Sequence, residues 1–158
     1  MKLLRVGVKG KEKPAALDKN GKIRDLSSHI IDLNSDTVNF ETIKKLESID
    51  LENLPEISNS ERIGACINKP GKFVAIGLNY SDHAAESGLP VPSEPIPFSK
   101  ATSASVGPND NVEIHRNSSE TDWEVELGII IGKKAKYIDE NSAQDYIAGY
   151  CVINDVSE

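Results

Sequence analysis

Residues 122–131 read Asp-Trp-Glu-Val-Glu-Leu-Gly-Ile-Ile-Ile, and this stretch decides how the second half of the chain folds. Glu124 and Glu126 are two residues apart, so on a β-strand their side chains point to the same face. The nearly continuous apolar run that follows, 127–131, predicts that the strand continues into a core. Two like charges side by side repel unless a positive group lies between them, so the stretch predicts a strand whose carboxylates need a cationic partner.

Asp155 follows a second apolar run and could supply a third oxygen ligand from a neighbouring strand. Three carboxylates with neither cysteine nor histidine favour a hard cation, Mg²⁺ or Mn²⁺, over Zn²⁺. A second interpretation stays open at this point, because Glu-x-Glu is also common on the solvated face of a sheet. The residues therefore predict a metal site at Glu124, Glu126 and Asp155, with a solvated sheet face as the alternative.

Composition and charge narrow the class of protein. The chain has 158 residues, 38% of them hydrophobic, and a formal net charge of −7. This charge argues against nucleic acid or an anionic membrane as the main partner. No apolar run approaches the roughly 20 residues of a membrane span, and the amino terminus lacks a signal-peptide pattern, so we expect a cytoplasmic location. Cys66 and Cys151 lie among aliphatic residues without metal-like spacing, which predicts buried, inert thiols.

Hydrophobic periodicity and turn residues predict an α+β chain that is mostly β. A change in composition near residue 65 predicts a small, β-rich amino-terminal domain over 1–65, followed by a second domain over 66–158. Short helices are expected after the cap candidates Asn39 and Ser81, the second ending at Gly88, and near 140–146. The expected strands are 3–8, 14–18, 22–26, 73–78 (a buried strand), 125–131 and 147–155. Asn20-Gly21, a strong turn signal, predicts that 14–18 and 22–26 form a hairpin.

His83 and Glu86 form a second pair of candidate functional residues. They are three residues apart, a spacing that places both on one face of a helix. A histidine held by a carboxylate has a fixed tautomer and a more basic imidazole, as a general base requires. A simple surface pair is the alternative interpretation.

The order of these motifs resembles the fumarylacetoacetate hydrolase family. The resemblance covers about residues 70–158, and the amino-terminal segments 4–7, 12–14 and 23–26 are similar to the small leading domain of bacterial members. Those members include enzymes that act on 2,4-diketo-3-deoxy sugar acids, and ureidoglycolate lyase-like proteins. The matching segments are 76–86, 94–95, 98–100, 107–110, 122–128, 131–133, 148–150 and 154–157.

The resemblance implies a mixed β-roll or barrel-like catalytic domain, of which this chain holds the first part. It implies a site that binds Mg²⁺ or Mn²⁺, with Ca²⁺ as a further candidate, and a protein that forms a homodimer at full length. By motif position, the implied roles are metal ligands for Glu124, Glu126 and Asp155, a lid dyad for His83 and Glu86, and substrate binding for Lys100.

The implied activity is metal-dependent hydrolysis of a C–C bond in a small β-diketo acid, of the acylpyruvate or diketo-deoxy sugar acid type. One alternative is a decarboxylase, lyase or isomerase that acts on an oxaloacetate-like acid through the same metal enolate. Because family members continue well past the segment 154–157, we also expect the chain to be truncated. A further alternative is therefore an inactive fragment that needs the missing carboxyl-terminal half.

Overall fold

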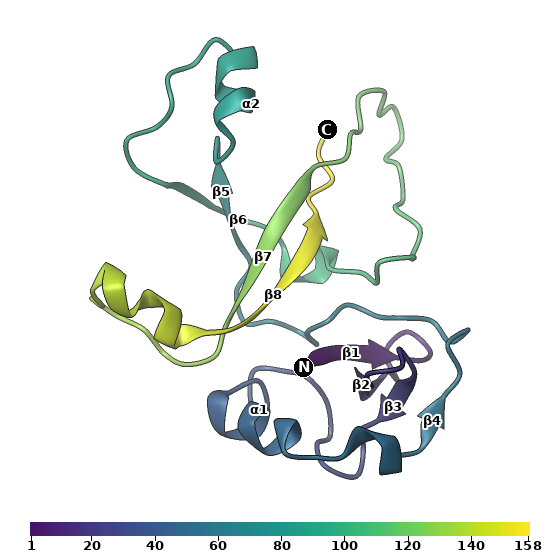
Figure 1. Ribbon diagram of the computed structural model, residues 1–158. Helices are drawn as coiled ribbons and strands as arrows, with labels where there is room; N and C mark the ends of the chain where they lie inside the picture. Colours follow the sequence, from purple (N-terminus) through teal and green to yellow (C-terminus); the bar gives the residue numbers. More distant parts are fainter. The chain divides into compact units, whose positions relative to one another are not determined.

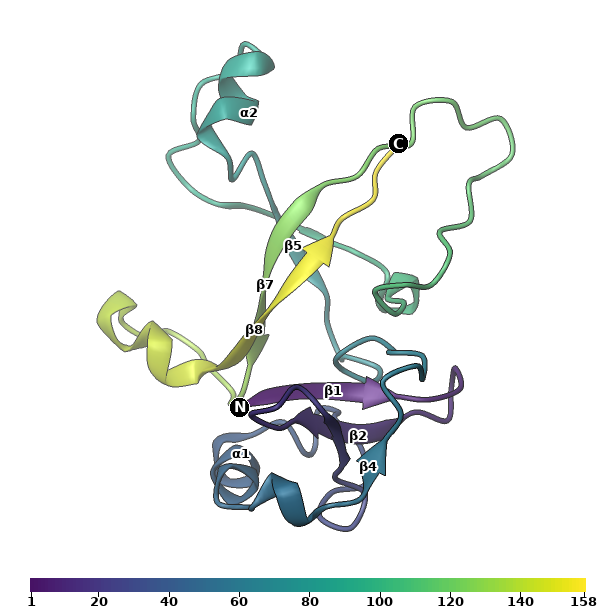
Figure 2. The ribbon, with the colours of Figure 1, turned by 45° about the vertical axis from the view of Figure 1, so that its right-hand side comes forward.

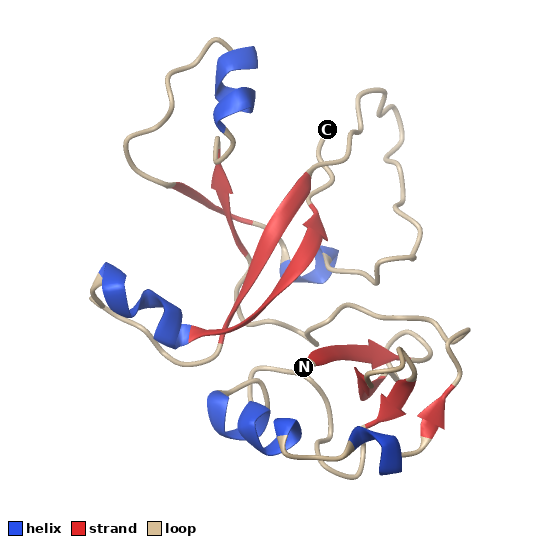
Figure 3. Cartoon of the chain, in the orientation of Figure 1, coloured by secondary structure: helices blue, strands red, loops and turns tan.

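The computed structural model describes residues 1–158, which form two compact units. One unit contains residues 1–68 and 106–158, and the other contains residues 69–105. Strands predominate and the helices are short, as Figure 3 shows, which confirms the expected α+β, mostly β class. Two expectations stay predictions. One is the domain boundary near residue 65, and the other is a mixed β-roll or barrel-like catalytic domain of which this chain holds the first part.

Residues 1–68 build an antiparallel sheet in which neighbouring strands follow chain order (Figure 1). Its second turn contains Asn20-Gly21, where Gly21 has φ of +76° and Asp18 accepts the amide of Lys22. A left-handed backbone of this kind favours glycine, so the predicted turn is confirmed. The fourth strand was not predicted, because it lies in a polar, proline-bearing connector. The strands are β1 (Lys2–Val6), β2 (Lys13–Leu17), β3 (Ile23–Asp25) and β4 (Glu56–Ile57).

Helix α1 (Phe40–Glu47) lies beside this sheet in both views (Figures 1 and 2). The Asn39 side chain accepts the backbone N–H of Thr42 at 2.9 Å, so the predicted cap is confirmed. Leu46, 2% exposed, packs against Leu26 of the sheet layer. A 3-10 helix, Leu51–Asn53, and β4 follow. Both hydrophobic clusters of the protein lie within residues 1–63.

Strands β7 (Val125–Ile131) and β8 (Ile147–Asn154) form a two-stranded antiparallel ribbon, side by side in Figures 1 and 2. The predicted bounds are confirmed to within one residue, and a 3-10 helix, Glu140–Tyr146, connects the strands as expected. The expectation that β7 continues into a core is wrong. Alternate side chains of β7 are between 49% and 64% exposed, because one face of the ribbon has no covering layer; these are Val125, Leu127, Ile129 and Ile131.

The unit of residues 69–105 pairs β5 (Val74–Gly77) with β6 (Ile96–Ser99) and carries helix α2 (Ser81–Glu86). Residues 74–77 form the strand that was predicted over 73–78, but the prediction that this strand is buried is wrong. Val74 is 52% exposed, since the sheet has only two strands. The N-cap position lies one residue earlier than predicted, at Tyr80, so that helix α2 begins at Ser81 itself. Gly88 has φ of +65° after the last turn, which confirms its role in ending the helix.

A network of charged side chains joins residues 1–68 to the loop after residue 106. Arg5 holds Asp32 with two hydrogen bonds, 2.6 Å from Nε and 3.1 Å from Nη2, and also reaches Glu12 at 3.2 Å. Arg62 binds the second oxygen of Glu12 at 2.8 Å and holds Asp110 with two bonds of 2.7 and 2.6 Å. Burial opposes ionisation of Asp32, but hydrogen bonds from Arg5 and other donors hold its pKa below the ordinary value.

No helix of the chain is both long and apolar enough to span a membrane.

We predict that Asp32→Ala lowers the free energy of unfolding by about 3 kcal/mol, because it leaves the buried Arg5 guanidinium without its main partner. Urea denaturation followed by circular dichroism measures this change. The matched control is Glu41→Ala, which removes an exposed ion pair with Lys45 on α1 and should leave the denaturation midpoint unchanged. Equal midpoints for both variants would contradict the assigned role of Asp32.

Candidate metal and catalytic site

The register of β7 and β8 places two of the predicted ligands directly opposite each other. Val125 faces Asn154, and the same pairing continues outward to the bridge between Asp122 and Ser157. Between these pairs Glu124 lies opposite Asp155, whose N–H donates to the Glu124 carbonyl at 2.8 Å. The cross-strand neighbours are therefore two carboxylates, an arrangement that is unfavourable without a cation.

Glu126 lies two positions along β7 from Glu124 and opposite Ile153, so alternation puts its side chain on the same face. All three predicted ligands are half-buried. The backbone thus brings Glu124, Glu126 and Asp155 to one end of one face. Their side chains are not gathered into a ligand cluster: nowhere in the chain do three or more His, Cys, Asp or Glu side chains converge in a way that could hold a metal. The predicted ligand set stays a prediction.

The donor chemistry of these positions fits the implied cation. Carboxylate oxygens are the ligands that Mg²⁺ and Mn²⁺ prefer, and the three positions carry neither thiol nor imidazole. The backbone order also fits, because Glu126 lies on β7, Glu124 directly precedes β7, and Asp155 directly follows the paired strand β8. Residues Glu124, Glu126 and Asp155 would hold the cation.

A loop that closes beside these carboxylates is held by Glu158. Its carboxylate accepts the N–H groups of Ser119 and Glu120 at 3.1 and 3.3 Å, together with the hydroxyls of Ser118 and Thr121. The hydrogen bonds from Ser118 and then Thr121 lower the pKa of Glu158 to about 2. This contact fixes the start of the segment that leads into β7.

Farther along the same face of the ribbon, the thiol of Cys151 occupies space that Gly128 leaves open. A Cβ atom on Gly128 would lie 2.6 Å from Cys151 Sγ, too close for a side chain. Interaction with the other thiol lowers the pKa of Cys66 to about 7 and raises the pKa of Cys151. The prediction that both thiols are buried is wrong, because both are half-buried. That they are inert stays a prediction.

His83, Glu86 and Lys100 lie in the other compact unit. His83 and Glu86 share helix α2 as predicted, but both are exposed and no hydrogen bond joins their side chains. The Lys100 backbone N–H donates to the Phe73 carbonyl at 3.0 Å beside the β5–β6 pair, and its Nζ lies 5.6 Å from the centre of the Phe98 ring. His83 and Glu86 thus share one short helix without a bond between their side chains, and the roles of these three residues stay predictions.

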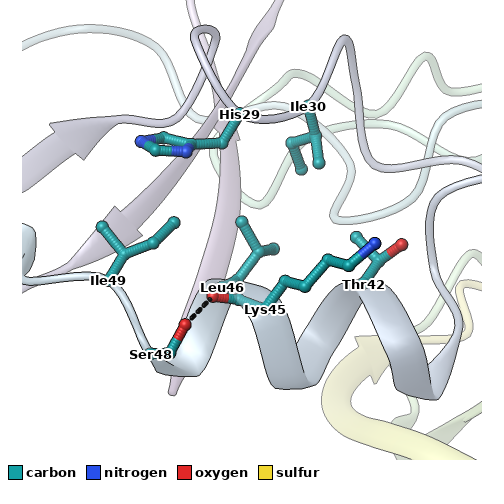
Figure 4. A pocket seen from close by; sticks show the side chains of 7 residues that line it. All are labelled: His29, Ile30, Thr42, Lys45, Leu46, Ser48 and Ile49. Atoms are coloured by element: carbon teal, nitrogen blue, oxygen red, sulfur yellow. Dashed lines mark hydrogen bonds between the residues drawn. The ribbon is translucent and has the colours of Figure 1, made fainter.

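A shallow pocket of about 400 Å³ lies between α1 and the loop after β3 (Figure 4). None of the predicted site residues lines it. Lys45, at its rim, is also paired with Glu41. The lining residues are His29, Ile30, Thr42, Lys45, Leu46, Ser48 and Ile49.

Residues 72–158 match the sequence model of the fumarylacetoacetate (FAA) hydrolase C-terminal domain, more than half of the chain. The chain belongs to the fumarylacetoacetate hydrolase family. All 158 residues align with proteins of Burkholderia ambifaria and Burkholderia orbicola whose names mark them as inferred hydrolases, each with 56% identity. The chain spans 56% of the length of these curated relatives, so it corresponds to about half of such a protein.

Solved structures of family members share the fold. The fumarylacetoacetate hydrolase of Exiguobacterium antarcticum matches with a TM-score of 0.76 and 28% identity, over 99% of this chain and 56% of that one. The maleylpyruvate hydrolase of Sphingobium sp. SYK-6, solved with manganese(II) and pyruvate, matches with a TM-score of 0.77 over 99% and 58%. Its identity of 21% supports a common fold alone.

We predict that the Glu158 carboxylate titrates far below the ordinary value of 4.5. Because the folded-state pKa is depressed, the stabilisation of the loop is complete above about pH 4.5 and is lost as the pH falls toward 2. The amide NMR shifts of Ser119 and Glu120 should follow this titration with a midpoint near 2. In Glu158→Gln the same shifts should stay flat over this range, and a midpoint near 4.5 in the wild type would contradict the assignment.

Proposed function

We propose that the protein is a metal-dependent hydrolase that cleaves a C–C bond in a small β-diketo acid, of the acylpyruvate or diketo-deoxy sugar acid type. The observation that carries the proposal is the register of β7 and β8, which sets Glu124 opposite Asp155 with Glu126 on the same face. Two comparisons support the proposal. The chain belongs to the fumarylacetoacetate hydrolase family, and it shares 28% identity with the fumarylacetoacetate hydrolase of Exiguobacterium antarcticum.

The proposed cation is Mg²⁺ or Mn²⁺, with Ca²⁺ as a further candidate. When bound, such a cation would act as a Lewis acid toward the oxygens of a 1,3-dicarbonyl compound. The carboxylates of Glu124, Glu126 and Asp155 would hold it, and half-burial would strengthen their attraction for it relative to open water. The manganese(II) and pyruvate in the maleylpyruvate hydrolase of the same fold are consistent with this choice.

The proposed general base is His83. Its imidazole would take a proton from the water that attacks the distal carbonyl, and Glu86, one helical turn later, would orient the ring. Lys100 would bind the substrate through its ammonium group, whose positive charge complements a carboxylate. The exposure of α2 leaves both side chains of the dyad accessible to a substrate.

A second candidate keeps the ligands and changes the reaction, with decarboxylation, lyase or isomerase chemistry on an oxaloacetate-like acid. A Mycobacterium abscessus structure assigned by inference as a 2-hydroxyhepta-2,4-diene-1,7-dioate isomerase favours it, with 26% identity and a TM-score of 0.74. Assay of the protein as its own cell makes it, with acylpyruvates and oxaloacetate side by side, separates the two reactions.

A third candidate is that these 158 residues alone are inactive. Activity would then require the rest of a longer chain, in a full-length protein that forms a homodimer.

We predict that Glu126→Gln weakens Mn²⁺ binding at least about tenfold, because an amide oxygen carries no charge to offset that of the cation. Isothermal titration of the chain with MnCl₂ measures the affinity. Glu113→Gln is the matched control, since Glu113 is an exposed glutamate outside the ribbon and should leave the affinity unchanged. Unchanged affinity in Glu126→Gln would remove Glu126 from the ligand set.

We predict that His83→Ala lowers turnover by about 10²–10⁴-fold, the usual contribution of a general base, while Mn²⁺ affinity stays at the wild-type value. Rates of β-diketo acid cleavage in the protein as its own cell makes it, combined with Mn²⁺ titration, test both parts. Glu86→Gln should show a smaller loss, because it removes only the orientation of the ring. Loss of Mn²⁺ binding in His83→Ala would contradict the role of His83 as a base.

A further inference from the structure

Two of the three proposed metal ligands lie outside the regular ladder of the β7–β8 ribbon. Glu124 directly precedes β7, and Asp155 directly follows β8. The ends of a two-stranded ribbon open more readily than its middle, because each terminal residue has few cross-strand contacts to hold it. The backbones that carry these two ligands therefore depend on the contacts that close the ribbon beyond them.

Backbone pairing continues past both ligands. The Asp155 N–H donates to the Glu124 carbonyl at 2.8 Å, and the Asn154 side chain accepts the Glu124 N–H at 3.0 Å. Farther out, Asp122 and Ser157 exchange both of their backbone hydrogen bonds, at 2.8 and 3.1 Å; we call these two residues the outer pair. The two ligands lie between the ladder and the outer pair, so loss of the outer pair would leave them at a frayed end.

The Glu158 carboxylate holds the outer pair closed. It directly follows the outer pair on the β8 side, and it accepts hydrogen bonds from four donors in the loop 118–121, which directly precedes the pair on the β7 side. Two of these donors are the N–H groups of Ser119 and Glu120, at 3.1 and 3.3 Å. The other two are the hydroxyls of Ser118 and Thr121. One side chain thus clamps four consecutive residues of the opposite segment.

The negative charge of Glu158 suits it to this task. An ionised carboxylate has two oxygens that together accept about four hydrogen bonds, and charged acceptors form stronger bonds than neutral ones. A glutamine at this position would keep one oxygen and turn an NH₂ group toward N–H and hydroxyl donors. Because these donors occupy its oxygens, Glu158 acts on the site through the backbone and not as a ligand.

We propose that Glu158 is a positioning residue of the cation site, which clamps the loop 118–121, closes the end of the ribbon and so holds the backbones of Glu124 and Asp155 side by side. Partners outside the ligand shell of a metal orient the ligands and strengthen binding in this way. The inference rests on the proposed function, because it assigns Glu158 a part in the metal site proposed there.

The matched control is Glu120→Gln. Removal of any negative charge near a cation site weakens its attraction for the cation, so the clamp must be separated from this general effect. Glu120 is an exposed residue of the clamped loop, and it contributes to the clamp through its backbone N–H, which the substitution keeps. Glu120→Gln and Glu158→Gln therefore remove the same charge from neighbouring places, and only Glu158→Gln removes the acceptor.

The test combines Mn²⁺ titration of the folded chain with amide hydrogen exchange of the metal-free chain. Glu158→Gln should lower the Mn²⁺ affinity about tenfold, whereas Glu120→Gln should keep it within about twofold. The amides of Asp122, Asp155 and Ser157 should exchange at least about tenfold faster in Glu158→Gln, because the end of the ribbon opens. The amide of Leu26, which donates to Pro14 in the amino-terminal sheet, should exchange at the wild-type rate.

The EPR spectrum of the Mn²⁺-saturated chain separates a positioning role from a general loss of stability. Displaced ligands should change the line shape of bound Mn²⁺ in Glu158→Gln, whereas a lower fraction of folded chain would leave the line shape as in the wild type. Unchanged line shape, unchanged exchange of the three ribbon amides, or equal affinity losses in Glu158→Gln and Glu120→Gln would each overturn the proposal.

Failure of this inference is distinguishable from failure of the proposed function. Weaker Mn²⁺ binding in Glu126→Gln with wild-type binding in Glu158→Gln would overturn the positioning role alone, whereas a wild-type chain that binds no Mn²⁺ would overturn both. Should Glu158→Gln fail to fold by circular dichroism, Thr121→Val decides the question. It removes one hydroxyl donor from the clamp without a change of charge, and it should lower the affinity about threefold; unchanged affinity would overturn the proposal.

Discussion

Antiparallel pairing of β7 with β8 is the constraint on which the second half of the chain depends. The same register holds from Ile130 opposite Gly149 outward to Asp122 opposite Ser157, and a shift of one residue would move every side chain of a strand to the other face. This register brings Glu124 to Asp155 and the Cys151 thiol to Gly128. The carboxylates and the thiol therefore share one face for a single geometric reason.

The charged network around Arg5 has a comparable role in the first half. Its guanidinium serves Asp32, Glu12 and a carbonyl of the segment beside Cys66, so burial of the charge is compensated on several sides. Arg62 continues the network to Asp110 in the loop after residue 106. The segment that carries Cys66 is thus positioned by electrostatic contacts, whereas the apolar clusters stabilise the sheet and α1 around it.

Local sequence signals predicted most of the elements. Alternation and turn residues predicted β7, β8 and the turn at Gly21, while Asn39 predicted the start of α1, because these features depend on neighbours within a few residues. Strand β4 was not predicted, since a two-residue strand in a proline-bearing connector exists only through pairing with β3. Burial was also misjudged for 73–78 and 127–131, because an apolar run does not reveal how many layers will cover it.

The sequence by itself determined the family and the order of its motifs, and it predicted the carboxylate set, because spacing along one strand or one helix is local information. Only the tertiary structure decided that Glu124 lies opposite Asp155 and that Arg62 pairs with Asp110. Both contacts join residues about thirty or more positions apart, and no local propensity specifies such a contact. Strand register and the packing of the loop after residue 106 specify them, and both arise only when the chain has folded.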